Sequence, residues 1–155
     1  YAEQALYDTI RQVESRGGAA CIVMISVHNY EEVKETYDTS IAGELIVNIS
    51  ERIQRLVRPL DVVTYFSPGL FALVLIQPNI KQCTAECYKR IFDGVRLKSY
   101  TTTAGFQPVS IGMSICAATA DTGAPTMGNM IKFATKELDE SVRTESIMVH
   151  HIIPE

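Results

Sequence analysis

The sequence lacks the features that mark several specialised classes of protein. No apolar run approaches the roughly 20 residues that a membrane-spanning helix needs. Lysine and arginine form no block, and the net charge is −4. We therefore expect no contact with polymeric nucleic acid or with a membrane, although this charge is compatible with a small anionic ligand in a local basic pocket.

The four cysteines include no CxxC pair. Cys21 and Cys116 fall in apolar segments, whereas Cys83 and Cys87 lie one turn apart on an expected helix. A metal or redox pair would need further ligands at suitable spacing, and no histidine or other cysteine supplies them. The pattern favours small hydrophobic residues in the core of a reduced, cytoplasmic protein, so we expect neither a metal site nor a cofactor.

Length and composition suit one domain with its own core. The 155 residues are 46% hydrophobic and 21% charged, which is ordinary for a soluble globular protein. Residues 2–16 have the pattern of an amphipathic helix rather than that of a signal peptide. We therefore expect residues 1–155 to form a single domain that is a fragment of a longer multidomain signalling protein.

The spacing of apolar residues predicts helices and strands in mixed order. Residues 19–27 form a nearly continuous apolar run, as in a central strand that is covered on both faces. The widest apolar stripe lies over 44–57 and predicts a helix. The other expected elements are helices over 2–16, 80–97 (ending near Gly94) and 127–138, one or two helical turns within 28–39, strands over 109–117 and 147–153, and a hairpin over 61–76. This order indicates an α/β (α+β) fold, with a central sheet of about five strands that is mixed with antiparallel pairs and flanked by helices.

The expected hairpin has the turn sequence Ser67-Pro68-Gly69-Leu70. Proline presets the backbone at the second position of a turn, and glycine accepts the positive φ that a type II turn needs at the third. The tip of a hairpin at the edge of a sheet is a common place to hold a reactive group. This tip carries no carboxylate, imidazole or thiol.

Six segments follow one another in an order and spacing that we recognise. They are 22–30, 36–37 with 42–45, 58–61, 71–75, 109–113 and 134–138. Together they resemble the GGDEF domain of diguanylate cyclases in a degenerate form, over nearly the whole chain. The family's leading motif, upstream of the first helix, is not in this sequence. The resemblance implies a nucleotide-cyclase-like sheet and a role in bacterial signal transduction by cyclic di-GMP.

The resemblance also implies where catalysis would occur in an active member of the family. There, divalent metals between the end of the first strand and the hairpin tip neutralise the triphosphate of GTP, and hard cations need oxygen ligands, chiefly carboxylates. The metal-binding aspartate of the first strand corresponds to Ser26. The signature of two glycines, two acids and a phenylalanine corresponds to residues 67–71, and of these only Phe71 matches.

Further positions of the family's site are also substituted. The guanine-binding asparagine and aspartate correspond to Lys34 and Gly43, and the phosphate-contacting lysines correspond to Glu31 and Val142. Pro68 removes an amide donor from the turn that approaches the phosphates. The resemblance therefore implies a domain that is not an enzyme, with no catalytic residue and no metal ligand.

One ligand site of the family is present in the sequence. Many GGDEF domains bind cyclic di-GMP at an RxxD motif that precedes the signature by five residues, and Arg58 and Asp61 match it in type and spacing. The family often adds an arginine from the following helix, which corresponds to Arg90 or, with a shift of one residue, to Lys89. An arginine grips a phosphate or a guanine edge with two parallel hydrogen bonds, and an aspartate accepts from guanine N–H groups.

A purely structural interpretation of these three residues is also open. Arg58 ends an expected helix, where a cation meets the exposed carbonyls. Asp61 follows a Pro-Leu turn and could cap it. Arg90 could be one exposed helical charge among others.

Three functions follow from these alternatives. The first is a cyclic di-GMP receptor that uses Arg58, Asp61 and Arg90. The second is a ligand-free module that assists homodimerisation or regulates an attached domain, such as an EAL phosphodiesterase. The third is residual GTP binding or catalysis, for which His28 and Glu35 are the nearby candidates.

Overall fold

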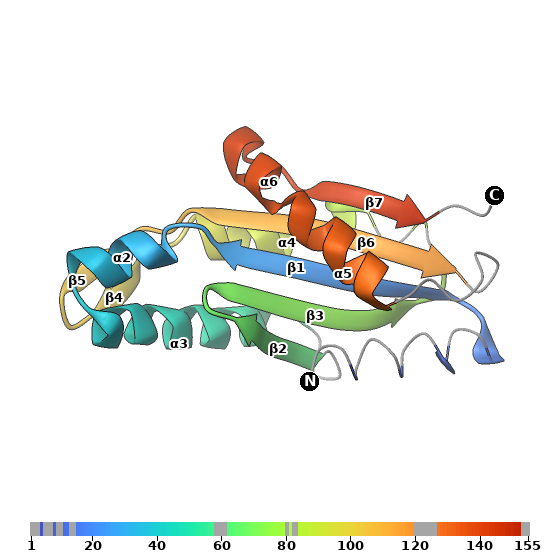
Figure 1. Cartoon of the computed structure of the whole chain (residues 1–155), viewed down its shortest axis with the longest axis horizontal. Coiled ribbons are helices and arrows are strands. Elements are labelled where there is room, and N and C mark those ends of the chain that lie inside the picture. Colours follow the sequence, from blue (N-terminus) through green and yellow to red (C-terminus); the bar gives the residue numbers. More distant parts are fainter. Residues whose placement is uncertain are drawn as a thin grey trace.

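The computed structural model describes residues 4, 8, 11–12, 15–57, 62–79, 81, 84–119 and 127–152. The described residues of the expected first helix are helical. The remaining elements, shown in Figure 1, are β1 (Ala19–Val27), α2 (Tyr30–Thr36), α3 (Thr39–Leu56), β2 (Val62–Ser67), β3 (Leu70–Gln77), α4 (Ala85–Arg96), β4 (Tyr100–Thr102), β5 (Gly105–Gln107), β6 (Ile111–Thr119), α5 (Met127–Lys136), α6 (Leu138–Thr144) and β7 (Met148–Ile152). No helix within the described ranges is long and apolar enough to cross a membrane.

The main sheet has five strands in the order β2-β3-β1-β6-β7. The pairs β2–β3, β3–β1 and β1–β6 are antiparallel, and β6–β7 is parallel. The expected mixed sheet of about five strands is therefore confirmed. As its continuous apolar run predicts, β1 lies at the centre of the sheet.

Helices cover both faces of the sheet. Alternate residues of β1 from Ala19 to Val27 pack on the face that α2, α3 and α4 cover. Ala20, Ile22 and Met24 pack on the opposite face with residues of α5 and α6. In Figure 1, α5 and α6 lie on the near side of the sheet. Because successive side chains of a strand point to opposite faces, an apolar residue at nearly every position buries β1 on both sides.

Three helix boundaries differ from those that the sequence predicted. The helix α3 begins at Thr39, five residues earlier than expected, because Asp38 accepts a hydrogen bond from the Ile41 amide at 2.8 Å and caps the first turn. The helix α4 begins at Ala85, five residues later than expected, and continues through Gly94 to Arg96. A Cβ atom at Gly94 would lie 2.8 Å from Leu56 Cδ1, so this glycine serves the close packing of α4 on α3 rather than ending the helix.

Two further features were missed by the sequence analysis. The single helix expected over 127–138 is two helices, α5 and α6, which join at Glu137. A second, two-stranded sheet is formed by β4 and β5. Its turn is held by Thr102, whose hydroxyl donates to the Gly105 carbonyl at 2.9 Å, and Gly105 has a φ of +103°.

Candidate functional site

The hairpin tip lies against the end of β1. Ser67 pairs with Leu70, and Gly69 between them has a φ of +76°, as a type II turn requires at its third position. The Val27 amide donates a hydrogen bond to the Gly69 carbonyl at 2.7 Å. The structure therefore brings together the hairpin tip and the end of the first strand, the two regions between which the sequence analysis located the family's metal site.

Ser26 is beside this junction, between two neighbouring strands. It pairs with Leu70 of β3 on one side and with Gly112 of β6 on the other. Its hydroxyl oxygen is buried and has no hydrogen-bond partner. A Cβ atom added to Gly112 would lie 2.7 Å from that oxygen. Ser26 thus contributes one neutral hydroxyl in a closely packed contact, where a metal site would need carboxylates.

Two tyrosines fill the space around the turn. The Gly69 amide donates to the Tyr65 hydroxyl at 2.7 Å, and the Tyr65 ring packs against Phe71 with 5.1 Å between ring centroids. A Cβ atom at Gly69 would lie 3.1 Å from Cβ of Tyr30. Burial raises the pKa of Tyr65, the Gly69 hydrogen bond lowers it, and Tyr30 raises it again. The amide that this turn would offer to a phosphate is therefore already paired with a phenol.

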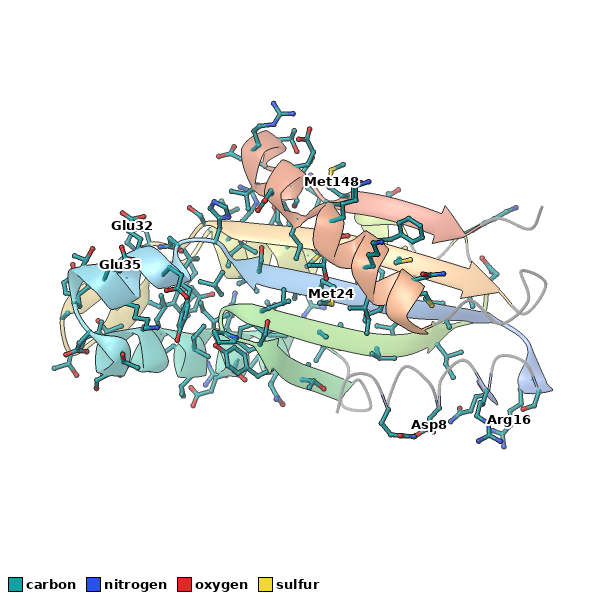
Figure 2. All side chains as sticks on the ribbon, in the orientation of Figure 1. Asp8, Arg16, Met24, Glu32, Glu35 and Met148 are labelled. Carbon is teal, nitrogen blue, oxygen red and sulfur yellow. The ribbon has the colours of Figure 1, made fainter. Side chains whose placement is uncertain are left out.

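The residues at the substituted positions on α2 and α3 are exposed. Lys34 lies 4.0 Å from Glu31 across one turn of α2, which makes an ion pair within the helix. Gly43 is exposed on α3, and a Cβ atom there would meet nothing within 4 Å. Figure 2 shows Glu35 on α2, and its side chain is exposed. His28 Nδ1 lies 3.8 Å from an Asp139 carboxylate oxygen.

The described ranges contain no cluster of three or more histidine, cysteine, aspartate or glutamate side chains that could hold a metal ion. Cys21 and Cys116 are buried in the core, whereas Cys87 is exposed on α4. Cys83, its expected neighbour on that helix, lies outside the described residues. Beside the hairpin tip, Ser26 therefore offers one neutral hydroxyl, whereas a divalent cation needs several oxygen ligands.

Only one of the three predicted ligand residues is placed by the structure. Arg58 and Asp61 lie outside the described residues. Arg90 is exposed on α4, as is Lys89. The helix α4 is held to α3 by Arg52, whose Nε donates to the Gly94 carbonyl at 3.0 Å.

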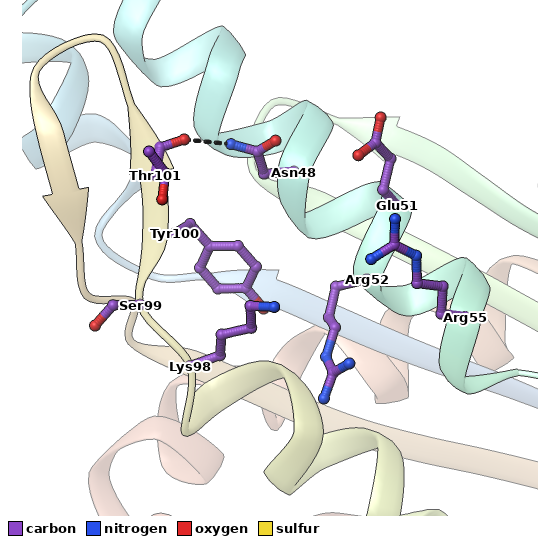
Figure 3. Close-up of a pocket in the computed structure, with 8 residues that line it drawn as sticks. All are labelled: Asn48, Glu51, Arg52, Arg55, Lys98, Ser99, Tyr100 and Thr101. Carbon is purple, nitrogen blue, oxygen red and sulfur yellow. Dashed lines mark hydrogen bonds between the residues drawn. The ribbon is translucent and has the colours of Figure 1, made fainter.

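The structure also contains a pocket that the sequence analysis did not single out. Its volume is about 190 Å³, and it lies between α3 and the chain that connects α4 to β4 (Figure 3). It is lined by Asn48, Glu51, Arg52, Arg55, Lys98, Ser99, Tyr100 and Thr101. The four lining residues on α3, which are Asn48, Glu51, Arg52 and Arg55, recur at the spacing of one helical face. This spacing is visible in the sequence. Their partners 98–101 come from a different element, so the cavity has no local signature.

A sequence model described as "Diguanylate cyclase, GGDEF domain" matches residues 1–146. No curated protein gives a significant match. Among solved structures, the GGDEF domain of TpbB (YfiN) from Pseudomonas aeruginosa has a TM-score of 0.80 and 16% identity, over 97% of this chain and 87% of that one. The GGDEF domain of DgcB from Caulobacter crescentus, in complex with c-di-GMP, has a TM-score of 0.79 and 12% identity, over 97% and 87%.

An EAL/GGDEF domain protein from M. capsulatus is also similar. Its TM-score is 0.71 and its identity 19%, over 97% of this chain and 98% of that chain. At these identities the solved structures show the shared fold, and the sequence model shows the shared family.

Proposed function

This chain belongs to the GGDEF family of diguanylate cyclase domains, and from that premise we propose that it is a catalytically inactive cyclic di-GMP receptor. In this proposal Arg58, Asp61 and Arg90 bind the ligand, and occupancy of the site is transmitted to neighbouring domains of a longer protein. Family membership supports a place in the cyclic di-GMP system. For this chain we propose in addition that catalysis is lost and that the domain acts as a receptor.

The buried hydroxyl of Ser26 is the observation that carries the proposed inactivity. Ser26 stands where the first strand meets the hairpin tip, yet its oxygen has no partner and is in close contact with β6. A divalent cation requires several oxygen ligands, and carboxylates supply them in most protein sites. Without such a cation the negative charge of a triphosphate is not neutralised, and the Gly69 amide of the turn already donates to the Tyr65 hydroxyl.

The receptor role is supported by the chemistry of the three residues. Arginine gives bidentate, charge-assisted hydrogen bonds to phosphate, and its charge does not depend on pH in the physiological range. Arg90 is exposed on α4, the helix that Arg52 joins to the last turns of α3. The related DgcB domain was solved in complex with c-di-GMP.

Titration calorimetry of cyclic di-GMP into the purified chain tests the receptor role. We expect saturable binding that weakens roughly 10- to 100-fold in Arg58→Ala, because each charge-assisted hydrogen bond contributes about 1.5–3 kcal/mol. Arg90→Ala should weaken binding as well. Ser26→Ala and Arg143→Ala should bind as the unmodified chain does, since Arg143 is on α6 and pairs with Glu140.

Absence of binding by the folded chain would contradict the receptor role. Formation of cyclic di-GMP from GTP and Mg²⁺ would contradict the proposed inactivity. Binding of GTP that depends on Mg²⁺ and is lost in Glu35→Gln would instead support the residual nucleotide site.

A ligand-free interaction module is the second candidate. Three large apolar side chains are unusually exposed: Phe106 on β5 at 73%, Leu97 after α4 at 70%, and Val47 on α3 at 56%. Exposed apolar side chains of this size suit contact with another domain or a second copy. The similar M. capsulatus protein is described as an EAL/GGDEF domain protein. If no nucleotide binds, sedimentation of the chain over a range of concentrations should show self-association that Phe106→Ser weakens.

A further inference from the structure

The pocket between α3 and the α4–β4 connection has an excess of positive charge. Its lining includes the cations Arg52, Arg55 and Lys98 and a single carboxylate, that of Glu51. The chain as a whole has a net charge of −4, so the pocket is a positively charged site on a negatively charged molecule. A concave surface with one dominant sign of charge raises the local concentration of oppositely charged ligands.

The pocket cations have few partners that would neutralise them. Neither Arg55 nor Lys98 makes an ion pair within 4.0 Å with any residue in the described part of the chain. Arg52 uses Nε to donate to the Gly94 carbonyl, which leaves its terminal nitrogen atoms for another acceptor. Figure 3 shows Arg52 and Lys98 extending beside the Tyr100 ring, while Arg55 reaches back along α3 towards Glu51.

Hydrogen bonds hold the walls of the pocket in place. The Asn48 side-chain amide of α3 donates to the Thr101 carbonyl at 2.7 Å, drawn as a dashed line in Figure 3. The Tyr100 hydroxyl donates to the Val95 carbonyl at 2.9 Å. Burial raises the pKa of Tyr100 to about 12, while Arg52 lowers it, so this phenol is neutral at pH 7 and adds no negative charge. Arg52 is itself anchored through Nε to Gly94, so a ligand meets fixed walls and one positioned guanidinium, which reduces the entropy lost on binding.

We propose that this pocket binds the phosphoryl group of a small phosphate monoester, with Arg52 and Lys98 as its principal contacts. A volume of about 190 Å³ is below the roughly 300–1,000 Å³ of pockets that enclose a drug-sized molecule. The phosphoryl group fits inside, and the rest of the monoester extends outward past the exposed Ser99. The guanidinium of Arg52 matches two phosphoryl oxygens, and Lys98 adds a point charge.

The proposal is tested by NMR titration of the ¹⁵N-labelled chain with inorganic phosphate and, separately, with glycerol phosphate. Ionic strength is kept constant with chloride, because diffuse attraction depends on it. We expect saturable shifts of the amides of residues 98–101. Tighter binding of glycerol phosphate would identify a monoester as the ligand, and equal affinity would identify free phosphate as sufficient. Shifts that grow linearly without saturation would overturn the proposal.

Three variants make the result specific. Lys98→Glu reverses one pocket charge at an exposed position and should weaken binding at least tenfold, and Arg52→Gln should do the same. Lys132→Gln removes one charge from an exposed position on α5, outside the pocket, and should leave the affinity unchanged. Because Arg52 also bonds to α4, Lys98→Glu keeps the test decisive if Arg52→Gln does not fold. Equal weakening by Lys132→Gln would show attraction by net charge alone and overturn the site.

We expect this pocket to act separately from the proposed cyclic di-GMP site, because its lining does not include Arg90, the residue of that site that the structure describes. Arg58→Ala should weaken cyclic di-GMP binding roughly 10- to 100-fold and leave the phosphate-induced shifts of residues 98–101 intact. Lys98→Glu should weaken phosphate binding and leave the binding of cyclic di-GMP unchanged. Loss of both ligands in Arg58→Ala would assign the phosphate shifts to the dinucleotide site.

Discussion

At the scale of single residues, Ser26 is a buried polar side chain without a hydrogen-bond partner. An unpaired buried polar group costs about 1–3 kcal/mol. Nothing in the packing of the sheet requires a hydroxyl at this position. The neighbouring Gly112 brings β6 so close that a Cβ atom would lie 2.7 Å from the hydroxyl oxygen.

We expect Ser26→Ala to raise the free energy of unfolding by up to about 1 kcal/mol, because it removes the unpaired hydroxyl and almost no volume. Urea denaturation at pH 7 measures this change. The matched control is Ser141→Ala. Ser141 Oγ accepts from the Met113 amide at 2.8 Å and donates to the Ser146 carbonyl at 2.6 Å. Removal of the Ser141 hydroxyl should lower the free energy of unfolding by about 1–3 kcal/mol, because the Met113 amide loses its acceptor. Destabilisation by both variants to a similar extent would contradict this account of Ser26.

At the scale of elements, glycines have opposite roles in a turn and in a helix. Gly69 lies in the β2–β3 turn with a φ of +76°, and an added Cβ atom would lie 3.1 Å from Tyr30 Cβ. Gly43 is in α3, where an added Cβ atom would meet nothing within 4 Å. The same substitution should therefore have opposite effects in the two elements.

We expect Gly69→Ala to lower the free energy of unfolding by about 1–3 kcal/mol, because alanine is strained at positive φ. Gly43→Ala should raise it by about 0.5–1 kcal/mol, because alanine favours the helix. Thermal denaturation followed by circular dichroism gives both changes. A stable Gly69→Ala variant would mean that the turn does not need positive φ.

The elements differ in how well the sequence predicts them, for physical reasons. The continuous apolar run of β1 and the Pro68-Gly69 turn are local signals, and both predictions are confirmed. The start of α3 depends on the Asp38 cap, and α4 continues through Gly94 because Leu56 fills the space beside it. Tertiary contacts of this kind outweigh local propensity. The β4–β5 hairpin has only three residues in each strand, too few to show a period.

The candidate site was predicted in part for similar reasons. The resemblance to a family located Ser26 beside the hairpin tip, and the register of β1 with β3 confirms this neighbourhood. The contact between Tyr65 and the Gly69 amide was not foreseen, since a hydroxyl that folds back onto its own turn leaves no sequence pattern. Arg58 and Asp61 stay predictions.

At the scale of the whole molecule, the buried core contains groups that resist ionisation. Burial raises the pKa of Cys116 to about 12, and Cys116 is fully buried in β6, beside the central strand β1. The pKa of Tyr100 is also raised to about 12, by burial, with Arg52 acting in the opposite direction. In the unfolded chain a thiol loses its proton near pH 8.5 and a phenol near pH 10, as approximate values. Each group therefore adds stability that is complete below its unfolded pKa and is lost as pH rises towards about 12.

We expect the urea midpoint to fall progressively as pH rises above about 9, because the unfolded state then holds fewer protons than the folded state. Midpoints measured at a series of pH values from 7 to 11 give the slope. Cys116→Ala should flatten the slope between about pH 9 and 10, and Tyr100→Phe should flatten it above about pH 10. Unchanged slopes in both variants would show that the loss of stability at alkaline pH arises from other groups.

The central position of β1 has a consequence for the order in which the chain is made. Its residues pair on one side with β3 and on the other with β6, where Ala19 meets Thr119. A ribosome adds about 5–20 residues per second, so β6 emerges roughly 5–20 s after β1. Both edges of this apolar strand are unpaired until β3 emerges, and the edge that pairs with β6 stays unpaired for the whole interval. An apolar strand edge that stays unpaired can pair with another chain, so the nascent chain needs that edge to be shielded until β6 arrives.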